Sequence, residues 1–246
     1  MKAIVVGAKG RMGGHVLTAL ENAGIECVAK VDGFYEKSQG NEYKSLSEVD
    51  VQADVLIDFS FHLLIKEIAE FIAKTKIPSV IATTGHTDEE KQIIYSAAEI
   101  APVFYSGNYS LGITMLCDAV KRVVSAFPDA DVEIVETHHN RKADAPSGTA
   151  KMLFEAVKEA RPSAVEVDGR RGMCKRTKDE VGINAVRVGN IVGIHEVIIG
   201  TDFEQITLKH EAYDRAMFAQ GAVKAAVYLA DKKSGLYVMK DLLTDK

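Results

Sequence analysis

The chain has few cysteines, and none of them stands in a disulfide or metal-binding pattern. Cys27, Cys117 and Cys174 are far apart in the 246-residue sequence. An odd and sparse set of cysteines is typical of proteins in a reducing compartment. We therefore expect no disulfide framework, and we expect Cys27 and Cys117, which stand in apolar stretches, to be reduced core residues.

The sequence also lacks a long apolar segment and an excess of positive charge. No apolar run reaches the roughly 20 residues that a membrane-spanning helix needs, and Met1 leads into an expected strand rather than into a signal peptide. The formal net charge is −5, whereas nucleic-acid binding calls for a basic face. These absences predict a cytoplasmic protein that binds neither membranes nor nucleic acid.

Short apolar strands alternate with amphipathic helices over the first half of the chain. Strands are expected at residues 2–6, 27–31, 55–57 and 79–82 and from residue 103 on. This alternation predicts a parallel sheet with helices on both faces. Strands that are apolar and β-branched suit a sheet that is buried on both sides.

The pattern changes after residue 108. We expect a helix over 113–127, a strand over 131–135, a helix over 147–160 and a polar, basic loop over 169–182. Three more strands follow at 184–188, 195–199 and 204–210, and then a helix at 215–229. Successive strands with little helix between them indicate an α+β unit with an antiparallel or mixed sheet.

A glycine-rich turn connects the first strand to the first helix. It comprises Gly7, Ala8, Lys9, Gly10, Arg11, Met12 and Gly13. A turn of this kind brings backbone N–H groups to a pyrophosphate at a helix N-terminus, so it predicts a Rossmann-like dinucleotide site. The alternative is a turn that is merely structural.

Asp32 ends the second expected strand, where such folds place an acidic residue that accepts hydrogen bonds from the ribose of NADH. Because Asp32 precedes Gly33, it also fits a simple turn. Lys30 and Lys37 lie nearby in the sequence and suit the 2′-phosphate of NADPH instead. We therefore expect the protein to use NADH, NADPH or both.

Small and polar residues follow three more strands of the first half. They are Asp58 to Ser60, then Ala82, Thr83 and Thr84, and finally Ser106, Gly107, Asn108 and Tyr109. Ligands of open α/β sheets bind outside the carboxyl ends of the strands. Together with the glycine turn, the loops at 82–84 and 106–109 therefore predict a nicotinamide pocket, although each alone is more often an ordinary loop.

The segment from Glu136 to Ala150 carries proton donors beside a helix start. His138, His139 and Lys142 are groups that move protons near neutral pH. The run Ser147-Gly148-Thr149 opens a helix whose N–H groups suit an anion. We expect chemistry on a small carboxylated molecule, and no metal, because no third ligand stands at a familiar spacing and Lys142 would repel a cation.

The segment 136–150 resembles the signature of the 4-hydroxy-tetrahydrodipicolinate reductase (dihydrodipicolinate reductase) family. The matching positions are Glu136, His138, His139, Lys142, Asp144, Pro146, Ser147, Gly148, Thr149 and Ala150. The stretches 7–13, 58–60, 83–85, 108–110, 187–195 and 215–221 are also similar to that family. The resemblance spans nearly the whole chain.

The resemblance implies a fold, a reaction and residue roles. It implies a dinucleotide-binding domain of residues 1–109 with a return at 215–246, and an inserted substrate and tetramerisation domain of residues 110–214. The implied reaction is NAD(P)H-dependent reduction of a small cyclic imine with two carboxylates, by a homotetramer of diaminopimelate and lysine biosynthesis. His138 and Lys142 correspond to the catalytic groups, and His139, Ser147, Gly148 and Thr149 to substrate contacts.

The cofactor contacts implied by the same resemblance are the glycine turn, Asp32 and the loops at 82–84 and 106–109. Two other readings stay open. One is a regulatory protein that binds a nicotinamide nucleotide without catalysis, and the other is a different imine or amino-acid reductase on the same scaffold. His138 and Lys142 argue against the first of these, because a sensor needs no proton donors.

Overall fold

The computed structural model describes residues 1–244, so Asp245 and Lys246, at the end of the expected C-terminal return, lie outside the described residues. The chain divides into two compact units. Unit 1 comprises Met1–Tyr109 and the segment that begins at Arg215, and unit 2 is Ser110–Asp214. Each unit is described by itself.

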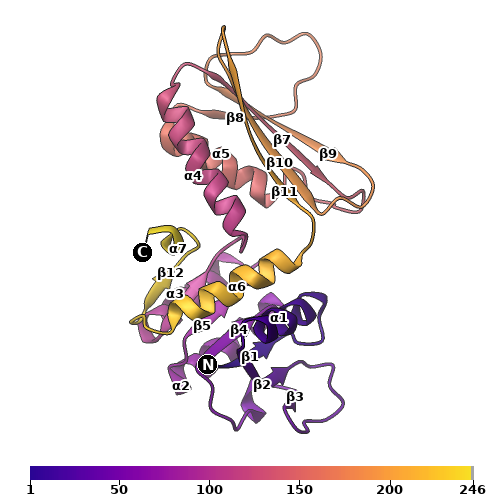
Figure 1. Ribbon diagram of the computed structural model, residues 1–246, viewed down its shortest axis with the longest axis vertical. Helices are drawn as coiled ribbons and strands as arrows, with labels where there is room; N and C mark the ends of the chain where they lie inside the picture. Colours follow the sequence, from indigo (N-terminus) through magenta and orange to yellow (C-terminus); the bar gives the residue numbers. More distant parts are fainter. Residues whose placement is uncertain (245–246) are drawn as a thin grey trace. The chain divides into compact units, whose positions relative to one another are not determined.

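Unit 1 is built on a parallel sheet (Figure 1), whose strand order within the described residues is β12-β6-β5-β4-β1-β2-β3. The strands are β1 (Lys2–Val6), β2 (Glu26–Val31), β3 (Glu42–Tyr43), β4 (Val55–Asp58), β5 (Ser79–Ile81), β6 (Pro102–Tyr105) and β12 (Gly235–Tyr237). The order runs outward in both directions from β1 and β4. The carboxyl ends of these two strands therefore mark the switch point where such sheets bind ligands.

Helices cover both faces of this sheet. They are α1 (Arg11–Asn22), α2 (Ile65–Thr75), α3 (Asp88–Ile100) and α6 (Ala216–Leu229). Unit 1 also contains the short helix α7 (Asp241–Thr244) and the 3-10 turns η1 (Leu46–Glu48) and η2 (His62–Leu64). Ile4 and Val6 of β1 pack in one core with Ile68 of α2 and Ile94 of α3. Residues of a strand alternate between faces, so the other face of β1 is turned toward α1 and α6, which pack against each other.

Unit 2 contains a mixed sheet of order β11-β10-β7-β9-β8. Its strands are β7 (Asp131–His138), β8 (Val165–Asp168), β9 (Glu180–Arg187), β10 (Gly193–Gly200) and β11 (Gln205–Ala212). Strand β9 pairs in parallel with β7 and β8, whereas β10 pairs antiparallel with β7 and β11. The pairing confirms the predicted mixed sheet.

The helices α4 (Leu111–Ala126) and α5 (Gly148–Ala160) lie side by side on one face of this sheet (Figure 1). Val132 and Ile134 of β7 point into the core that these helices close. Serine residues fix both helix starts: Ser110 accepts a hydrogen bond from the N–H of Ile113, and Ser147 accepts one from the N–H of Ala150. A serine in this position satisfies an N–H group that the helix itself leaves unpaired.

The structure confirms the predicted fold class and corrects several expected elements. The strand expected at 131–135 continues to His138, and the loop expected at 169–182 ends earlier because β9 begins at Glu180. Cys27 and Cys117 are free thiols and half-buried, and Cys117 packs against the core of unit 2. The short strands β3, β8 and β12 were not predicted.

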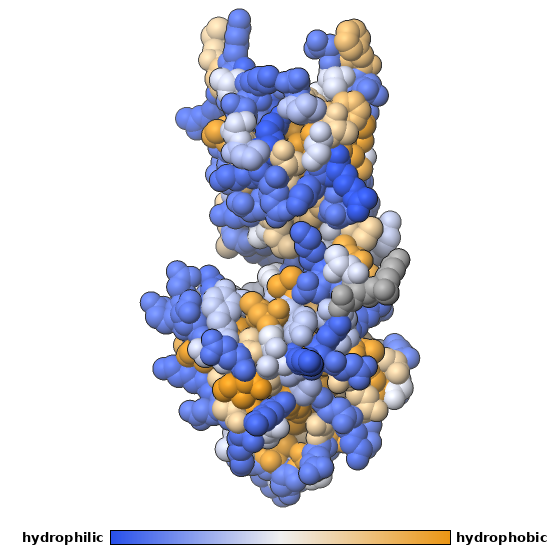
Figure 2. All heavy atoms as spheres, turned by 90° about the vertical axis from the view of Figure 1, so that its left-hand side faces the viewer, coloured by the Kyte–Doolittle hydropathy of each residue, from blue (hydrophilic) through white to orange (hydrophobic). Residues whose placement is uncertain are grey.

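Figure 2 shows hydrophilic side chains over most of one face, with apolar side chains scattered among them. Among residues 1–244, no helix has both the length and the apolar character that a membrane crossing requires.

Candidate functional site

Two glycines of the turn in unit 1 stand where the neighbouring backbone leaves no room for a side chain. Gly7 has φ +81°, and a Cβ on it would lie 2.4 Å from the carbonyl oxygen of Phe59. A Cβ on Gly13 would lie 2.2 Å from the carbonyl oxygen of Gly7, so this glycine lets α1 pack directly on the turn. No side chain caps the start of α1, and its first turn carries no acidic residue. This helix N-terminus is therefore suited to hold a pyrophosphate.

A cavity of about 470 Å³ opens beside this turn. Four of the predicted cofactor residues, Gly7, Lys9, Gly10 and Asp32, line it. The Asp32 carboxylate accepts hydrogen bonds from the backbone N–H groups of Lys9 at 2.9 Å and Phe34 at 3.0 Å. These bonds hold Asp32 at the wall of the cavity, and Lys44, which the sequence did not single out, also lines it.

The predicted nicotinamide loops follow neighbouring strands β5 and β6, so they share the carboxyl edge of the sheet. Thr83 is buried and Thr84 exposed. The ring of Tyr109 is buried, and its hydroxyl lies 2.9 Å from the carbonyl oxygen of Ile81 and 3.0 Å from that of Phe104. Any contact of Tyr109 with a nucleotide therefore has to come from its backbone.

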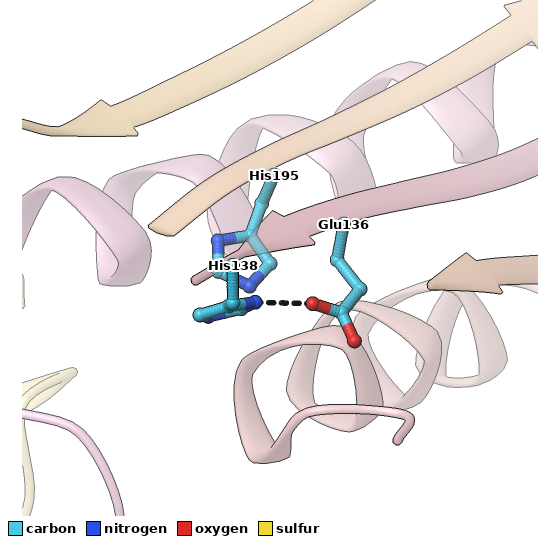
Figure 3. Close-up of side chains that lie close together, drawn as sticks. All are labelled: Glu136, His138 and His195. Carbon is cyan, nitrogen blue, oxygen red and sulfur yellow. Dashed lines mark hydrogen bonds and ion pairs between the residues drawn. The ribbon is translucent and has the colours of Figure 1, made fainter. Parts of the chain in front are cut away.

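The most strongly connected group of unit 2 is the buried carboxylate of Glu136. Figure 3 shows Glu136 and His138, both on β7, turned toward each other, with a hydrogen bond between Nδ1 of His138 and the carboxylate. Arg187 of β9 donates two hydrogen bonds to Glu136, at 2.9 and 3.1 Å, and the N–H of Ser147 donates a fourth. Burial alone would raise the pKa of Glu136, but the bonds from His138 and Arg187 outweigh it and lower the pKa to about 2.

His195 of β10 lies next to His138, with ring centroids 5.1 Å apart. Its Nε2 is 3.2 Å from the hydroxyl oxygen of Ser147, the residue that caps α5. Burial, together with the neighbouring His138, lowers the pKa of His195 to about 3. His195 is therefore neutral near pH 7 and acts as a hydrogen-bonding group rather than as a charge.

Lys142 and His139 lie in the loop after β7. The Nζ atom of Lys142 is 2.8 and 2.9 Å from the two carboxylate oxygens of Asp144. The Asp144 side chain is 63% exposed and that of Lys142 is 21% exposed. The Lys142 ammonium has three N–H donors, so it can bind a substrate while Asp144 still holds it. The N–H of His139 donates to the carbonyl oxygen of Ile191, which fixes this loop next to the approach to β10.

Glu136, His138 and His195 offer three metal-ligating atoms within 4.8 Å of one another. Sequence spacing gave no hint of His195 as a third ligand, because it stands on a distant strand. The donor set nevertheless fits a cation poorly. Both Glu136 oxygens already accept bonds from Arg187, and this guanidinium would repel the metal. The geometry therefore favours a hydrogen-bonded network of protein side chains over a metal site.

The structure brings the predicted groups of 136–149 together in unit 2. His138, Lys142, His139, Ser147, Gly148 and Thr149 all lie on the end of β7, on the loop that follows it or at the start of α5. Sequence reasoning did not assign roles to Glu136, Asp144, Arg187 and His195. For Arg187 and His195 the only available signal was their place in the family-like stretch 187–195.

A parallel sheet with a glycine turn at its switch point, in a chain whose other unit has a buried acid–base network, is typical of oxidoreductases that use a nicotinamide dinucleotide. The family model described as dihydrodipicolinate reductase, N-terminus, matches residues 1–109, and the one described as dihydrodipicolinate reductase, C-terminus, matches residues 112–243. The chain belongs to the dihydrodipicolinate reductase family.

Full-length relatives agree with this assignment. A protein of Caldanaerobacter subterraneus named 4-hydroxy-tetrahydrodipicolinate reductase is 44% identical, covering 99% of this chain and 98% of its own length. A protein of Clostridium novyi with the same name is 39% identical, over 100% of this chain and 99% of its own. Such matches support the reductase over the regulatory and other-reductase readings.

Solved structures support the fold. Dihydrodipicolinate reductase from Paenisporosarcina sp. TG-14, bound to dipicolinate, matches 97% of this chain and 97% of its own with a TM-score of 0.80 at 24% identity. Aspartate dehydrogenase from Thermotoga maritima matches with a TM-score of 0.51 at 15% identity. The second likeness shows that related scaffolds carry other activities, so the fold alone does not choose the substrate.

Proposed function

We propose that this chain catalyses the NAD(P)H-dependent reduction of 4-hydroxy-tetrahydrodipicolinate to tetrahydrodipicolinate, a step of diaminopimelate and lysine biosynthesis. The 4-hydroxyl group leaves as water, which gives dihydrodipicolinate, and this conjugated imine takes up the hydride and a proton. The observation that carries this proposal is the family match along nearly the whole chain. The proton-donor network of unit 2 adds independent support, because reduction of a conjugated imine needs a proton at the carbon next to the one that receives hydride.

The substrate site is proposed to lie at the end of β7 and the start of α5. The helix carries no acidic residue in its first turn, so the backbone at Gly148 and Thr149 suits one substrate carboxylate. His139 assists in holding this group. Ser147 positions the helix start, because its N–H donates to Glu136 and its hydroxyl lies beside His195.

The proton donors are proposed to be Lys142 and His138. Lys142, oriented by Asp144, stabilises developing negative charge on the substrate and delivers the proton. His138 presents Nε2 to the reaction as a general acid or base, because its Nδ1 is held by Glu136. A Cβ on Gly193 would lie only 3.1 Å from this Nε2, so the glycine leaves space for it.

The cofactor site is proposed to be the glycine turn and its cavity. When bound, NADH or NADPH supplies the hydride. The N-terminus of α1 holds the pyrophosphate, and Asp32 accepts from the adenosine ribose of NADH. Lys9 and Lys44 line the same cavity and offer positive charge to the 2′-phosphate of NADPH, which favours use of both nucleotides.

A homotetramer in the cytoplasm is proposed for the assembled enzyme. Helices α4 and α5 cover one face of the unit 2 sheet, and the other face carries the half-exposed apolar side chains of Val135, Ile194 and Ile198. This face is the proposed contact between subunits. The three free thiols fit a reducing compartment.

One assay tests the reaction. The purified protein is mixed with NADH or NADPH and with substrate generated in place by the enzyme that condenses pyruvate and aspartate semialdehyde, and oxidation of the nucleotide is followed by absorbance. Oxidation that requires the generated substrate supports the proposal. Oxidation with oxaloacetate and ammonia instead, or none with either, would reject it.

A further inference from the structure

Glu136 and Arg187 form an ion pair whose two partners contact different parts of the proposed proton-donor site. Within unit 2, the Glu136 side chain is fully buried and that of Arg187 is 19% exposed. Two nearly parallel hydrogen bonds, at 2.9 and 3.1 Å, join them. A bidentate carboxylate–guanidinium pair fixes both groups in orientation as well as in distance.

The carboxylate side of the pair holds one proton donor and the anion cradle. Glu136 accepts from Nδ1 of His138, so this ring must carry its proton on Nδ1 and is turned in one direction. Glu136 also accepts from the N–H of Ser147 at 3.1 Å, which ties the first residue before α5 to the same carboxylate.

The guanidinium side of the pair reaches the other proton donor. Arg187 donates to the backbone carbonyl oxygen of Asp144 at 2.6 Å. The Asp144 carboxylate in turn holds Nζ of Lys142. Arg187 is also the register partner of His138 on the neighbouring strand. One ion pair, with one partner on β7 and the other on β9, therefore connects His138, Lys142 and the start of α5.

We propose that Glu136 and Arg187 are the positioning pair of the active site, which fixes the two proton donors relative to the substrate-binding helix start. The proposal rests on the function proposed above for His138 and Lys142. If the pair had only a structural role, its removal would lower kcat only through lost stability. If it positions the proton donors, kcat stays low even in a variant that regains its stability. A displacement of about 1 Å in such a site can cost about 10²-fold in rate.

The test uses the neutral variants Glu136→Gln and Arg187→Gln, singly and together, in the full-length protein. Each single variant leaves one buried charge without its partner, so both should lower the melting temperature. The double variant removes both charges, and Gln–Gln pairing should recover most of the melting temperature. We expect kcat to stay about 10²-fold below wild type in all three, with KM for the nucleotide unchanged.

The control is Glu159→Gln, which breaks the Lys121–Glu159 pair between α4 and α5 of the same unit and should leave kcat unchanged. A double variant that recovers kcat together with its melting temperature would overturn the positioning role. If the double variant does not fold, Arg187→Lys provides the test. Lysine keeps the positive charge but cannot make the two-fold hydrogen bond of a guanidinium to a carboxylate. A stable Arg187→Lys protein with normal kcat would also overturn the positioning role.

The variants His138→Gln and Lys142→Met distinguish a failure of the positioning role from a failure of the proposed proton donors. Full activity in both would mean that the proposed proton donors are wrong. Low activity in both, with normal kcat in the Glu136/Arg187 double variant, would reject the positioning pair and leave the proposed function standing.

Discussion

At the scale of single residues, the chemistry of this protein depends on buried polar groups that satisfy one another. Glu136 stays ionised because three neighbours donate to it, and His195 stays neutral because burial penalises its charged form. Both arrangements tie the stability of unit 2 to pH, since the folded and unfolded states bind protons differently.

His195 gives the first prediction. Its pKa of about 3 lies below that of an unfolded histidine, so the folded state binds fewer protons and loses stability as pH falls below about 6.5. Between pH 7 and pH 5 this loss is about 2 kcal/mol. Glu136 adds a further loss only below about pH 4.5, because its pKa is also depressed.

We expect His195→Gln to flatten the decline of unfolding free energy between pH 7 and pH 5, measured by urea denaturation at several pH values. The glutamine side chain retains a hydrogen-bonding group beside Ser147, which limits the loss at pH 7. Equal slopes in variant and wild type would contradict the assignment of His195 as a buried neutral histidine.

Asp32 gives a prediction about the cofactor. Its carboxylate stands at the wall of the cavity, where it suits the free ribose of NADH and repels the 2′-phosphate of NADPH. Asp32→Ala should therefore raise KM for NADH several-fold more than KM for NADPH. Steady-state titrations with both nucleotides provide the test, and equal changes of the two KM values would refute the ribose contact.

At the scale of elements, strands and helices with strong periodicity were predictable from the sequence. The helix α4 shows apolar residues at spacing of three and four, and β1 and β4 are continuous apolar runs. The strands β3, β8 and β12 were missed because they are two to four residues long and mostly exposed or half-buried. Their pairing comes from neighbouring strands rather than from their own pattern.

The proposed active-site motif was also predictable only where its residues are close together in the sequence. His138 and Lys142 stand in one short segment, so their proximity was visible in the sequence. The partners of this segment, Arg187 on β9 and His195 on β10, reach it only through strand pairing. Without the sheet register, nothing in the sequence indicates that Glu136 lies between His138 and Arg187.

The first helix gives a prediction with a matched control. Gly13 and Gly14 are adjacent in α1, but a Cβ on Gly13 would lie 2.2 Å from a backbone oxygen, whereas a Cβ on Gly14 would meet nothing within 4 Å. Gly13→Ala should push α1 off the glycine turn, cost about 1–3 kcal/mol of stability and weaken nucleotide binding.

Gly14→Ala should instead stabilise the protein by roughly 0.5–1 kcal/mol, because alanine is the better helix former, and leave nucleotide binding unchanged. Thermal unfolding and fluorescence titration with NADH measure the two effects. Similar results for the two variants would mean that the close contact of Gly13 with the turn does not exist.

At the scale of the whole molecule, the two units carry different parts of the proposed site. Unit 1 carries the nucleotide cavity and unit 2 carries the proton donors. The open face of the unit 2 sheet is the one large surface for which we propose a partner, a second copy of the chain. Its apolar side chains stand among charged ones such as Glu133 and Glu196, which pair across the strands with Ile198 and Val135.

Ile198→Asp places a charge in the middle of this face. We expect it to dissociate the proposed tetramer into smaller species, measured by sedimentation velocity, because burying an unpaired carboxylate in an interface is costly. Val227→Asp is the control, since Val227 is 54% exposed on α6 of unit 1. A wild-type protein that sediments as a monomer would remove the proposed assembly.

His138 and Lys142, held by their partners in unit 2, are proposed to protonate the substrate during nicotinamide-dependent reduction. The most direct measurement of this role is kcat of His138→Gln and of Lys142→Met under saturating nucleotide and substrate, beside wild type. We expect kcat to fall about 10²–10⁴-fold in each variant, with nucleotide affinity retained. Turnover near that of wild type in both variants would show that neither residue has this role.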